Sequence, residues 1–500
     1  MPAGTPKNGT GRETMEQQAQ PADMEVSESV MEELPDSREE ESAPGKQMHP
    51  LIKPKDYPSG VREWAMTAPA EMQYSAVAVA LADVSPYLAN YRLNYVYDNR
   101  DEPSAILLQV IVQGEQSSGK KYAWRITKRM LRPIQQRDEM FMAKAQEYKA
   151  LMRRKNVGKG KGGKKDELPP EPLCPLTIVP EKLSITELFV ICDAAVKSYG
   201  RTLINFQFAD EIDTIVAAGR QSFSDLTQVY KVAWDLGTKT GQAYRSENSY
   251  NATVDVCLSY VFCGTPNAVG RFMNNAAVEG GNVTRVVLVM LESHLGCNPP
   301  QFKDMTAEQE ASLNETLTRL MDLCYGPDGK LREETLLGMH WLYKPVKQWC
   351  DGVREYVSTH ISRAMDTFYK RSSVSAFRMA AALQVLYELE GKKSQREIHR
   401  LVKQSYLAFA DRILHNMLLR WGDEFEQASA CNNRTRFTVT DYFRELPDRF
   451  SKEILVGFLE QKGIVTDARQ VAYRWRKMGL LEEFRAGTGK IYVKTNKGKK

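Results

Sequence analysis

The strongest constraint on the fold of this chain is a short glycine-rich segment, Gly114-Glu-Gln-Ser-Ser-Gly119-Lys120. It follows an apolar run, 104–113, that is typical of a fully buried strand, and it precedes a stretch with helical periodicity. The pattern GxxxxGK between a strand and a helix predicts a phosphate-binding loop. Glycines let successive backbone N–H groups point at phosphate oxygens, the helix N-terminus adds partial positive charge, and Lys120 reaches the terminal phosphates.

One position departs from the usual pattern of such loops. Lys121 stands where Ser or Thr is common, and that hydroxyl normally helps to hold Mg²⁺. Ser117 and Ser118 do not easily replace it, so the sequence leaves the metal affinity open. The alternative interpretation of the segment is a Gly-Ser turn between a strand and a helix. As a nucleotide site, its predicted contacts are Gly114, Ser117, Ser118, Gly119, Lys120 and Lys121.

A second signal is an apolar strand that ends in carboxylates. The run 203–209 leads directly into Asp210 and Glu211. In such a Walker-B-like arrangement, Asp210 would hold Mg²⁺ through water and Glu211 would polarise the attacking water. Asp213 is a competing carboxylate, and an exposed acidic strand end is the alternative. The two motifs occur in the order that a nucleotide site requires, each after a strand.

Strand signals alternate with helical segments in the first part of the chain, which predicts a parallel α/β sheet. We expect strands at 104–113, 176–179, 203–209, 256–263 and 286–291, and a helix that opens at the capping box 184–187. Helical periodicity then covers 306–324, 333–371, 373–390 and 394–430. The sequence predicts a P-loop NTPase core at 49–295, with a charged helix and basic loop inserted at 134–170, and an all-helical domain at 296–430.

Two further residues are candidates for catalysis. Thr265 follows a buried strand within Cys263-Gly-Thr-Pro266, where a polar residue can position the attacking water, and a plain Thr-Pro turn is the alternative. Arg285 precedes the strand at 286–291 and could be an arginine finger that completes the site of a neighbouring subunit. A salt bridge at the strand edge is the alternative for Arg285.

Charge is unevenly distributed along the 500 residues, although the net charge is only +5. Residues 1–48 hold 4 Lys/Arg against 11 Asp/Glu, a net charge of −7, and are expected to form a disordered acidic arm. Residues 431–500 hold 16 Lys/Arg against 8 Asp/Glu, a net charge of +8, which favours contact with nucleic acid. No apolar run approaches the ~18 residues of a membrane helix and no signal-peptide core is present, so we expect a cytoplasmic protein without a membrane partner.

The basic end of the chain, 431–500, predicts a winged helix. Thr466 can cap a helix to Met478, and strands at 480–484 and 491–494 would flank the turn at 486–489. The helix would lie in a DNA major groove. A solvated basic helix in a protein-contact module is the alternative. The predicted DNA contacts are Arg469, Arg474, Arg476 and Lys477.

Several of these motifs, taken together, resemble a large domain family of unknown function that is common on plasmids and integrative elements of gut anaerobes. Members often follow a primase-type domain and are taken as its helicase-like ATPase half. The resemblance covers about residues 57–420, but Glu279-Gly-Gly stands where Glu-Asn-Gly is usual, and no primase-type domain precedes the core in this sequence. It rests on Asp210-Glu-Ile-Asp213, 222–234, Ala243-Tyr-Arg245, Cys263-Gly-Thr-Pro266, Glu279-Gly-Gly-Asn-Val-Thr-Arg285 and Ser375-Ala-Phe-Arg378.

The resemblance implies an ATP-binding core of the additional-strand (AAA+/RecA-like) type. It implies Lys120 on the phosphates, Asp210 and Glu211 on metal and water, and Arg285 as a finger that acts in trans. The implied ligands are ATP and Mg²⁺, and the implied partners are DNA, a separate primase or replication protein, and further copies of the chain.

The expected function is a DNA-stimulated ATPase, a helicase-like motor in the replication or mobilisation of a plasmid or integrative element. The alternative is a nucleotide-gated DNA-binding initiator or regulator with little turnover, which the departure at Lys121 keeps open. An interaction scaffold without nucleotide would require both motifs to be accidental.

Overall fold

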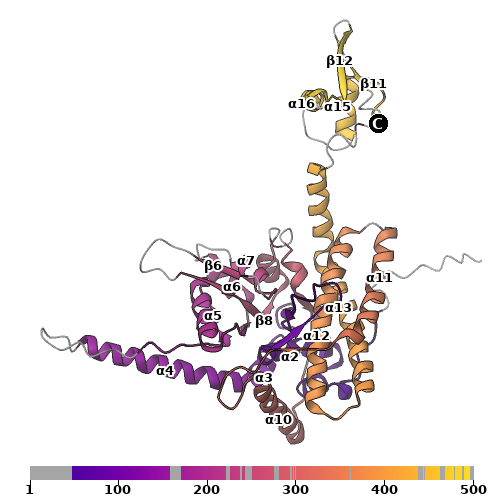
Figure 1. Ribbon diagram of the computed structural model, residues 1–500. Coiled ribbons are helices and arrows are strands. Elements are labelled where there is room, and N and C mark those ends of the chain that lie inside the picture. The colour runs from indigo at the N-terminus through magenta and orange to yellow at the C-terminus, as the bar shows by residue number, and fades with distance from the viewer. Residues whose placement is uncertain are drawn as a thin grey trace, which may run out of the picture. The chain divides into compact units, whose positions relative to one another are not determined.

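Figure 1 shows a computed structural model of the protein. The predicted acidic arm lies outside the described residues except for Met48, and so does the predicted basic loop from residue 158 onward. The structure describes residues 48–495 apart from 158–169, 221–225, 237–238, 243–250, 275–276, 278–280, 293–295, 297, 299, 361, 437–442, 444, 462–467, 478 and 487–488.

A five-stranded sheet forms the centre of the fold, and its strand order is β4-β5-β8-β3-β9. Every neighbouring pair is parallel, which confirms the predicted parallel α/β sheet. Because the strands are parallel, their carboxyl ends meet at one edge, where Gln113 lies opposite both Gly264 and Met290. The strands are β3 (Gln109–Gln113), β4 (Ile178–Val179), β5 (Ile204–Ala209), β8 (Cys257–Gly264) and β9 (Val287–Met290).

Several predicted elements differ in the structure, and α12 (Arg363–Glu390) runs through the predicted boundary between 333–371 and 373–390. The expected strand at 104–113 is divided into β2 (Ser104–Ala105) and β3, because β2 pairs with β1 (Tyr91–Leu93) in a separate small sheet. The first residues of the expected helix at 333–371 form β10 (Thr335–Leu336), which pairs with β1. Backbone hydrogen bonds from Thr335 to Asn90 and from Leu337 to Arg92, both 2.9 Å, outweigh the local helical pattern.

The helix α2 (Gln73–Val84) is apolar on all sides and is buried from Ser75 to Val84. A helix without a polar face needs packing partners all round. It contacts β3, β8 and β9 on one side and α12 (Arg363–Glu390) on another. Burial raises the pKa of its carboxyl group, Asp83, well above the usual range.

The remaining helices either flank the sheet or belong to the helical part of the chain that follows β9 (Figure 1). A break at Leu131 separates α3, which ends at Met130, from α4, which begins at Arg132 and has Pro133 in its first turn. Ser184 caps α5 by accepting a hydrogen bond from the Glu187 N–H at 3.1 Å. The bounds are α1 (Arg62–Thr67), α3 (Tyr122–Met130), α4 (Arg132–Val157), α5 (Ile185–Tyr199), α6 (Ile212–Arg220), α7 (Leu226–Val232), α8 (Pro266–Phe272), α10 (Ala307–Cys324), α11 (Tyr343–His360) and α13 (Gln395–Arg436). Short 3-10 helices are η1 (Pro54–Asp56), η2 (Ala70–Met72), η3 (Ser85–Leu88), η4 (Val283–Arg285) and η5 (His340–Leu342). The strands β6 (Lys239–Gln242) and β7 (Ala252–Asp255) pair with each other in antiparallel orientation.

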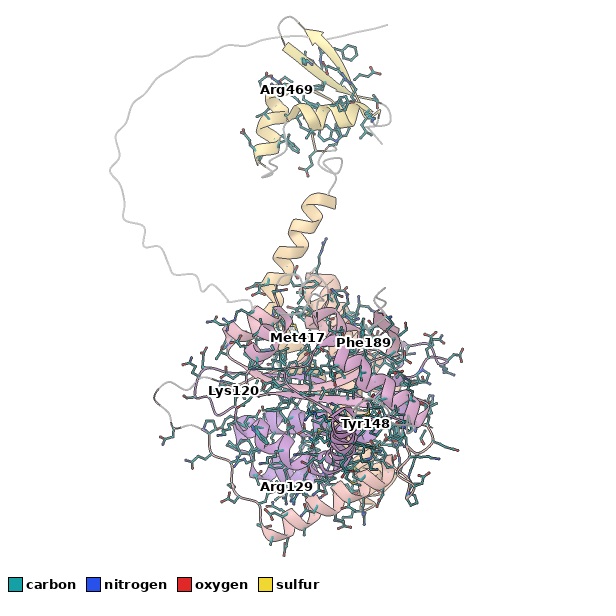
Figure 2. The ribbon with its side chains drawn as sticks, turned by 90° about the vertical axis from the view of Figure 1, so that its left-hand side faces the viewer. Lys120, Arg129, Tyr148, Phe189, Met417 and Arg469 are labelled. Carbon is teal, nitrogen blue, oxygen red and sulfur yellow. The ribbon has the colours of Figure 1, made fainter. Side chains whose placement is uncertain are left out.

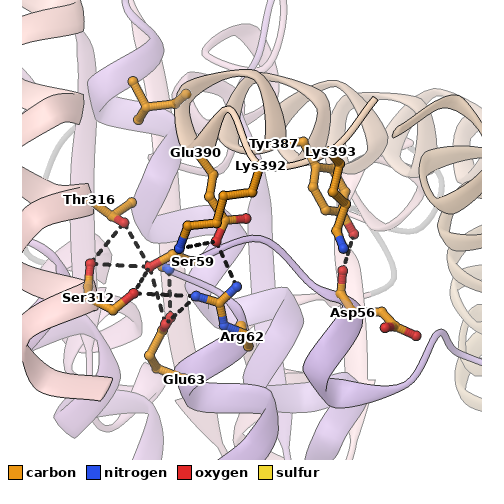
Figure 3. Close-up of polar contacts among 12 residues, drawn as sticks. Asp56, Ser59, Arg62, Glu63, Ser312, Thr316, Tyr387, Glu390, Lys392 and Lys393 are labelled. Carbon is orange, nitrogen blue, oxygen red and sulfur yellow. Dashed lines mark hydrogen bonds and ion pairs between the residues drawn. The ribbon is translucent and has the colours of Figure 1, made fainter. Parts of the chain in front are cut away.

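A polar network joins α1 to α10 and α12 (Figure 3). Arg62 donates from Nη1 to Glu390 Oε1 at 2.7 Å and from Nη2 to Ser312 Oγ at 3.3 Å. Glu63 is 1% exposed and accepts from the backbone N–H of Gly60 at 2.7 Å. A buried carboxylate is tolerated only when such partners are present, so the network fixes three segments that are far apart in the sequence.

Buried side chains on both sides of the predicted 295/296 boundary belong to one cluster, from Ile52 to Trp421.

The end of the chain forms a module with a separate cluster of buried residues. Its elements are β11 (Arg449–Ser451), α15 (Lys452–Gln461), α16 (Ala468–Lys477), β12 (Leu481–Ala486) and β13 (Gly489–Lys494), with the antiparallel order β11-β13-β12. Within the described residues of the chain, no helix is both long enough and apolar enough to cross a membrane.

Candidate functional site

The glycine-rich segment connects β3 to α3, as its sequence context predicts. Ser117 and Gly119 adopt left-handed backbone conformations, with φ of 63° and 82°. A non-glycine residue in that region is unusual and often marks a functional turn. Gly114 has no room for a side chain, since an added Cβ would lie 2.4 Å from Ser118 Oγ and 3.1 Å from Leu291 Cβ. The loop is therefore tightly closed at the point where it leaves the sheet.

Lys120, labelled in Figure 2, folds back over this loop. Its Nζ donates to the backbone carbonyls of Gly114 at 2.8 Å and Glu115 at 2.6 Å. Burial lowers the pKa of Lys120, while nearby acidic groups, Cys263 and Glu211 first, act in the opposite direction. The ammonium group thus lies at the loop, where the carboxylates of Glu211 and Asp210 stabilise its charged form.

Asp210 and Glu211, the predicted carboxylates, lie at the same end of the sheet as the loop. Asp210 and Glu211 follow β5 directly, and α6 begins at Ile212. Both carboxylates are exposed. In the strand order, β8 lies between β5 and β3, so the carboxylates face the loop across the end of one intervening strand.

Asp213, the competing carboxylate, is engaged by a residue that the sequence analysis did not single out. Arg271 donates from Nε to Asp213 Oδ1 at 3.2 Å and from Nη2 to Asp213 Oδ2 at 2.6 Å. This hydrogen bond raises the pKa of Arg271. Arg271 lies on α8, 58 positions from Asp213, and no local pattern indicates that the two meet.

Thr265 stands between β8 and α8 and acts as the cap of that helix. Its hydroxyl accepts a hydrogen bond from the Ala268 N–H at 3.3 Å. The capping role is compatible with the predicted Thr-Pro turn and also leaves Thr265 at the site, because its side chain lines the same cleft as the loop.

A cleft of about 650 Å³ joins these groups. It unites the loop after β3 with the ends of β5 and β8, the edge where parallel α/β sheets bind ligands. Of the predicted site residues, it gathers the loop serines, Gly119, both lysines, both carboxylates and Thr265, whereas the predicted contact Gly114 does not line it. Its lining is Gln116, Ser117, Ser118, Gly119, Lys120, Lys121, Asp210, Glu211, Asp213, Thr265, Asn267 and Arg271.

Arg285 lies elsewhere. It ends η4, just before β9, at the edge where the strands begin. Its side chain is 11% exposed, pairs with Asp235 at 3.5 Å and donates to the Gly281 carbonyl at 3.1 Å. Burial, followed by the nearby Arg371, lowers its pKa. Within one chain Arg285 therefore has the strand-edge salt bridge that the sequence left open, and it does not line the cleft.

The side chains that line the cleft suit a phosphate group with bound Mg²⁺. Mg²⁺ in nucleotide sites is held by one or two carboxylates together with substrate phosphates. Asp210 supplies such a carboxylate, and the Ser118 hydroxyl also lines the cleft, beside Lys121. In the described part of the chain, no three His, Cys, Asp or Glu side chains gather as a metal site. The residues present fit a metal that is shared with the phosphates of a ligand.

Another residue that sequence reasoning missed is Arg420 of α13. Its Nε donates to Gln113 Oε1 at 3.1 Å, and Gln113 directly precedes the loop. An added Cβ on Gly270 of α8 would lie 3.1 Å from its Nη2. Arg420 therefore connects α13 to the end of β3, just before the loop. The two residues are 307 positions apart in the sequence, so periodicity does not reveal their contact.

The predicted DNA-contact helix is α16 of the C-terminal module, where Figure 2 labels Arg469. Its apolar face, with Val471 and Trp475, is buried in the module, while Tyr473 is 57% exposed. Arg469, Arg476 and Lys477 are exposed, and the side chain of Arg474 lies outside the described residues. Arg476 pairs with Glu483 of β12 at 3.2 Å.

No protein-family model matches the chain, and no curated protein is significantly similar to it. The resemblance to the mobile-element family therefore rests on the motifs quoted above.

Proposed function

We propose that the chain binds and hydrolyses ATP in the cleft between the β3–α3 loop and the ends of β5 and β8. The observation that carries the proposal is the position of Lys120 in a closed glycine loop, opposite Asp210 and Glu211 across β8. A strand between the loop strand and the carboxylate strand supports assignment to the additional-strand class of P-loop ATPases.

In this proposal the loop N–H groups and Lys120 bind the phosphates, and Asp210 would help to hold the metal. Bound Mg²⁺ would neutralise phosphate charge. Glu211 accepts a proton from the attacking water, whose oxygen bonds to the γ-phosphorus. The bond between the γ-phosphorus and the bridging oxygen breaks, and its electron pair leaves with ADP. The proton then passes from Glu211 to solvent.

The single most informative measurement is ATP hydrolysis with and without single- and double-stranded DNA. We propose a DNA-stimulated motor of helicase type, assembled from several copies of the chain, and expect DNA to raise the rate. The second candidate is a nucleotide-gated DNA-binding regulator. Lys121 favours it, because this side chain lines the cleft where a metal-binding hydroxyl is usual. Tight ATP binding without DNA-stimulated turnover would support the regulator.

We also propose that the C-terminal module is a winged helix that binds DNA through the exposed face of α16. The chain order of β11, α15, α16, β12 and β13 supports this, since a helix is followed by a two-stranded wing. Lys490 of β13 and Arg476 of α16 share Glu483 of β12, at 2.6 and 3.2 Å, so DNA would have to compete with Glu483 for Arg476.

Truncation after Arg436, where α13 ends, is expected to weaken DNA binding strongly and to leave basal ATP hydrolysis largely intact. The reason is that the module has its own buried cluster, whereas both nucleotide motifs precede residue 290. Neutralising Arg469, Arg474 and Arg476 together in the full chain should lower the slope of log Kd against log salt concentration. The expected decrease corresponds to the loss of up to about three phosphate contacts. Fluorescence anisotropy at several salt concentrations measures both effects.

The matched control neutralises Lys197, Arg319 and Lys370, which are exposed and ion-paired outside the module. This control should leave the salt slope unchanged. If the truncated protein binds DNA as tightly as the full chain, with the same slope, the module is a protein-contact domain.

Arg285→Ala is expected to lower hydrolysis about a thousandfold or more without loss of ATP binding, provided that Arg285 serves a neighbouring subunit. For that role the side chain must be redirected from Asp235, its partner within the chain. Mixing Arg285→Ala with Lys120→Ala protein should then restore turnover at mixed interfaces. Absence of rescue in an assembly shown to be oligomeric, together with a lower melting temperature, would make Arg285 a packing residue.

A further inference from the structure

The pair Arg271–Asp213 occupies the candidate site without a part in the function proposed above. Arg271 directs two nitrogens at the two oxygens of Asp213, at 3.2 and 2.6 Å. Its side chain is 50% exposed, and that of Asp213 is 39% exposed. Both line the cleft that contains Lys120 and Glu211. An arginine therefore lies beside the predicted phosphate position within the same chain.

The fold holds this arginine close to the carboxylates for a clear reason. Asp213 lies in the first turn of α6, which follows β5, and Arg271 lies in the last turn of α8, which follows the neighbouring strand β8. Gly264, at the end of β8, lets these helices approach, since an added Cβ would lie 2.7 Å from Ile212 Cγ2 and 3.3 Å from Val269 Cγ2.

We propose that Arg271 is a catalytic residue of this site, which exchanges Asp213 for the terminal phosphate when a triphosphate binds. The proposal rests on the proposed function. A guanidinium presents a planar fork that suits phosphate oxygens as well as a carboxylate. An exposed ion pair contributes little to stability, so the exchange of partner costs little. A terminal phosphate carries more negative charge than a single carboxylate, and it therefore competes well for Arg271.

Asp213 then has a holding role: it keeps Arg271 at the rim of the cleft while the site is empty. Arg271 acts within its own chain, in contrast to Arg285, which lies at the opposite edge of the sheet. Developing charge on the transferred phosphoryl group is what such a cation stabilises. Arg271 would thus supply one cation from within the chain, in addition to any that Arg285 supplies from a neighbouring subunit.

The test compares Arg271→Ala and Arg271→Lys with the wild-type full chain. Steady-state hydrolysis gives kcat, and displacement of a fluorescent nucleotide gives Kd for ADP and for a non-hydrolysable ATP analogue. We expect Arg271→Ala to lower kcat about a hundredfold or more. The analogue should bind about tenfold more weakly, while the Kd of ADP, which lacks the terminal phosphate, should change less than about twofold. Arg271→Lys should recover analogue binding more than kcat, because lysine lacks the planar fork.

Two controls separate catalysis from loss of a surface pair. Lys197→Ala removes an exposed ion pair that is also 2.6 Å long, with Asp193 on α5, and should change neither constant. Asp213→Asn releases Arg271 and should bind the analogue as tightly as wild type or more tightly, with the Kd of ADP changed by less than about twofold.

The proposal is overturned if Arg271→Ala keeps kcat within about threefold, or if it weakens ADP and analogue binding equally. It is also overturned if both Asp213→Asn and Arg271→Ala lose turnover and both lower the melting temperature by a similar amount. The pair would then have a structural role only. Wild-type nucleotide affinity in Lys120→Ala would instead refute the nucleotide site itself, which keeps the two failures distinguishable.

Discussion

Lys120→Ala is expected to abolish ATP turnover and to weaken nucleotide binding while the fold survives. Lys120 is held at the loop by the carbonyls of Gly114 and Glu115, so its ammonium group is already next to the predicted phosphate position. Loss of one charge-assisted phosphate contact costs about 2–3 kcal/mol. That energy corresponds to a Kd raised by roughly 30- to 160-fold.

Calorimetric titration with a non-hydrolysable ATP analogue measures the binding loss, and phosphate release measures turnover. A circular-dichroism melt of the variant should remain close to that of wild type, since the side chain contacts mainly its own loop. Lys197→Ala, an exposed lysine of α5, serves as the control for loss of one positive charge. Wild-type affinity and turnover in Lys120→Ala would show that the segment is an ordinary turn.

The second large effect is expected from Glu211→Gln, which should bind ATP and fail to hydrolyse it. Glutamine keeps the size of the side chain and its hydrogen-bonding reach, but it cannot accept the proton of the attacking water. General base catalysis of this kind contributes about 10²- to 10⁴-fold to the rate. We therefore expect kcat to fall within that range, with the Kd of ATP changed by less than about twofold.

Asp213→Asn is the matched comparison, because Asp213 is the nearest carboxylate of the same run. The structure favours Glu211 for the water, since Glu211 lies between the end of β5 and the start of α6, whereas Asp213 already lies in the first turn of α6. A rapid filter-binding assay of retained nucleotide distinguishes a trapped ATP state from lost binding. If Asp213→Asn traps ATP and Glu211→Gln turns over normally, Asp213 is the residue that activates water.

The sequence alone determined the local elements of the site. A buried apolar run, two glycines and a helical stretch predict the strand, loop and helix that the structure shows as β3, the closed loop and α3. The run that ends at Ala209 predicts β5 and the position of Asp210 and Glu211 at its end. These elements are predictable because hydrophobic periodicity and glycine conformations act over a few neighbouring residues.

The tertiary structure alone decided which of these elements meet. Insertion of β8 between β3 and β5 places the carboxylates across from the loop, and no local pattern specifies strand order. The same holds for Arg271, which reaches Asp213 from 58 positions away. In α16, burial of Val471 and Trp475 separates a face that packs in the module from an exposed face. Strand order, long-range pairs and burial depend on packing between distant segments, whose energies have no counterpart in the adjacent sequence.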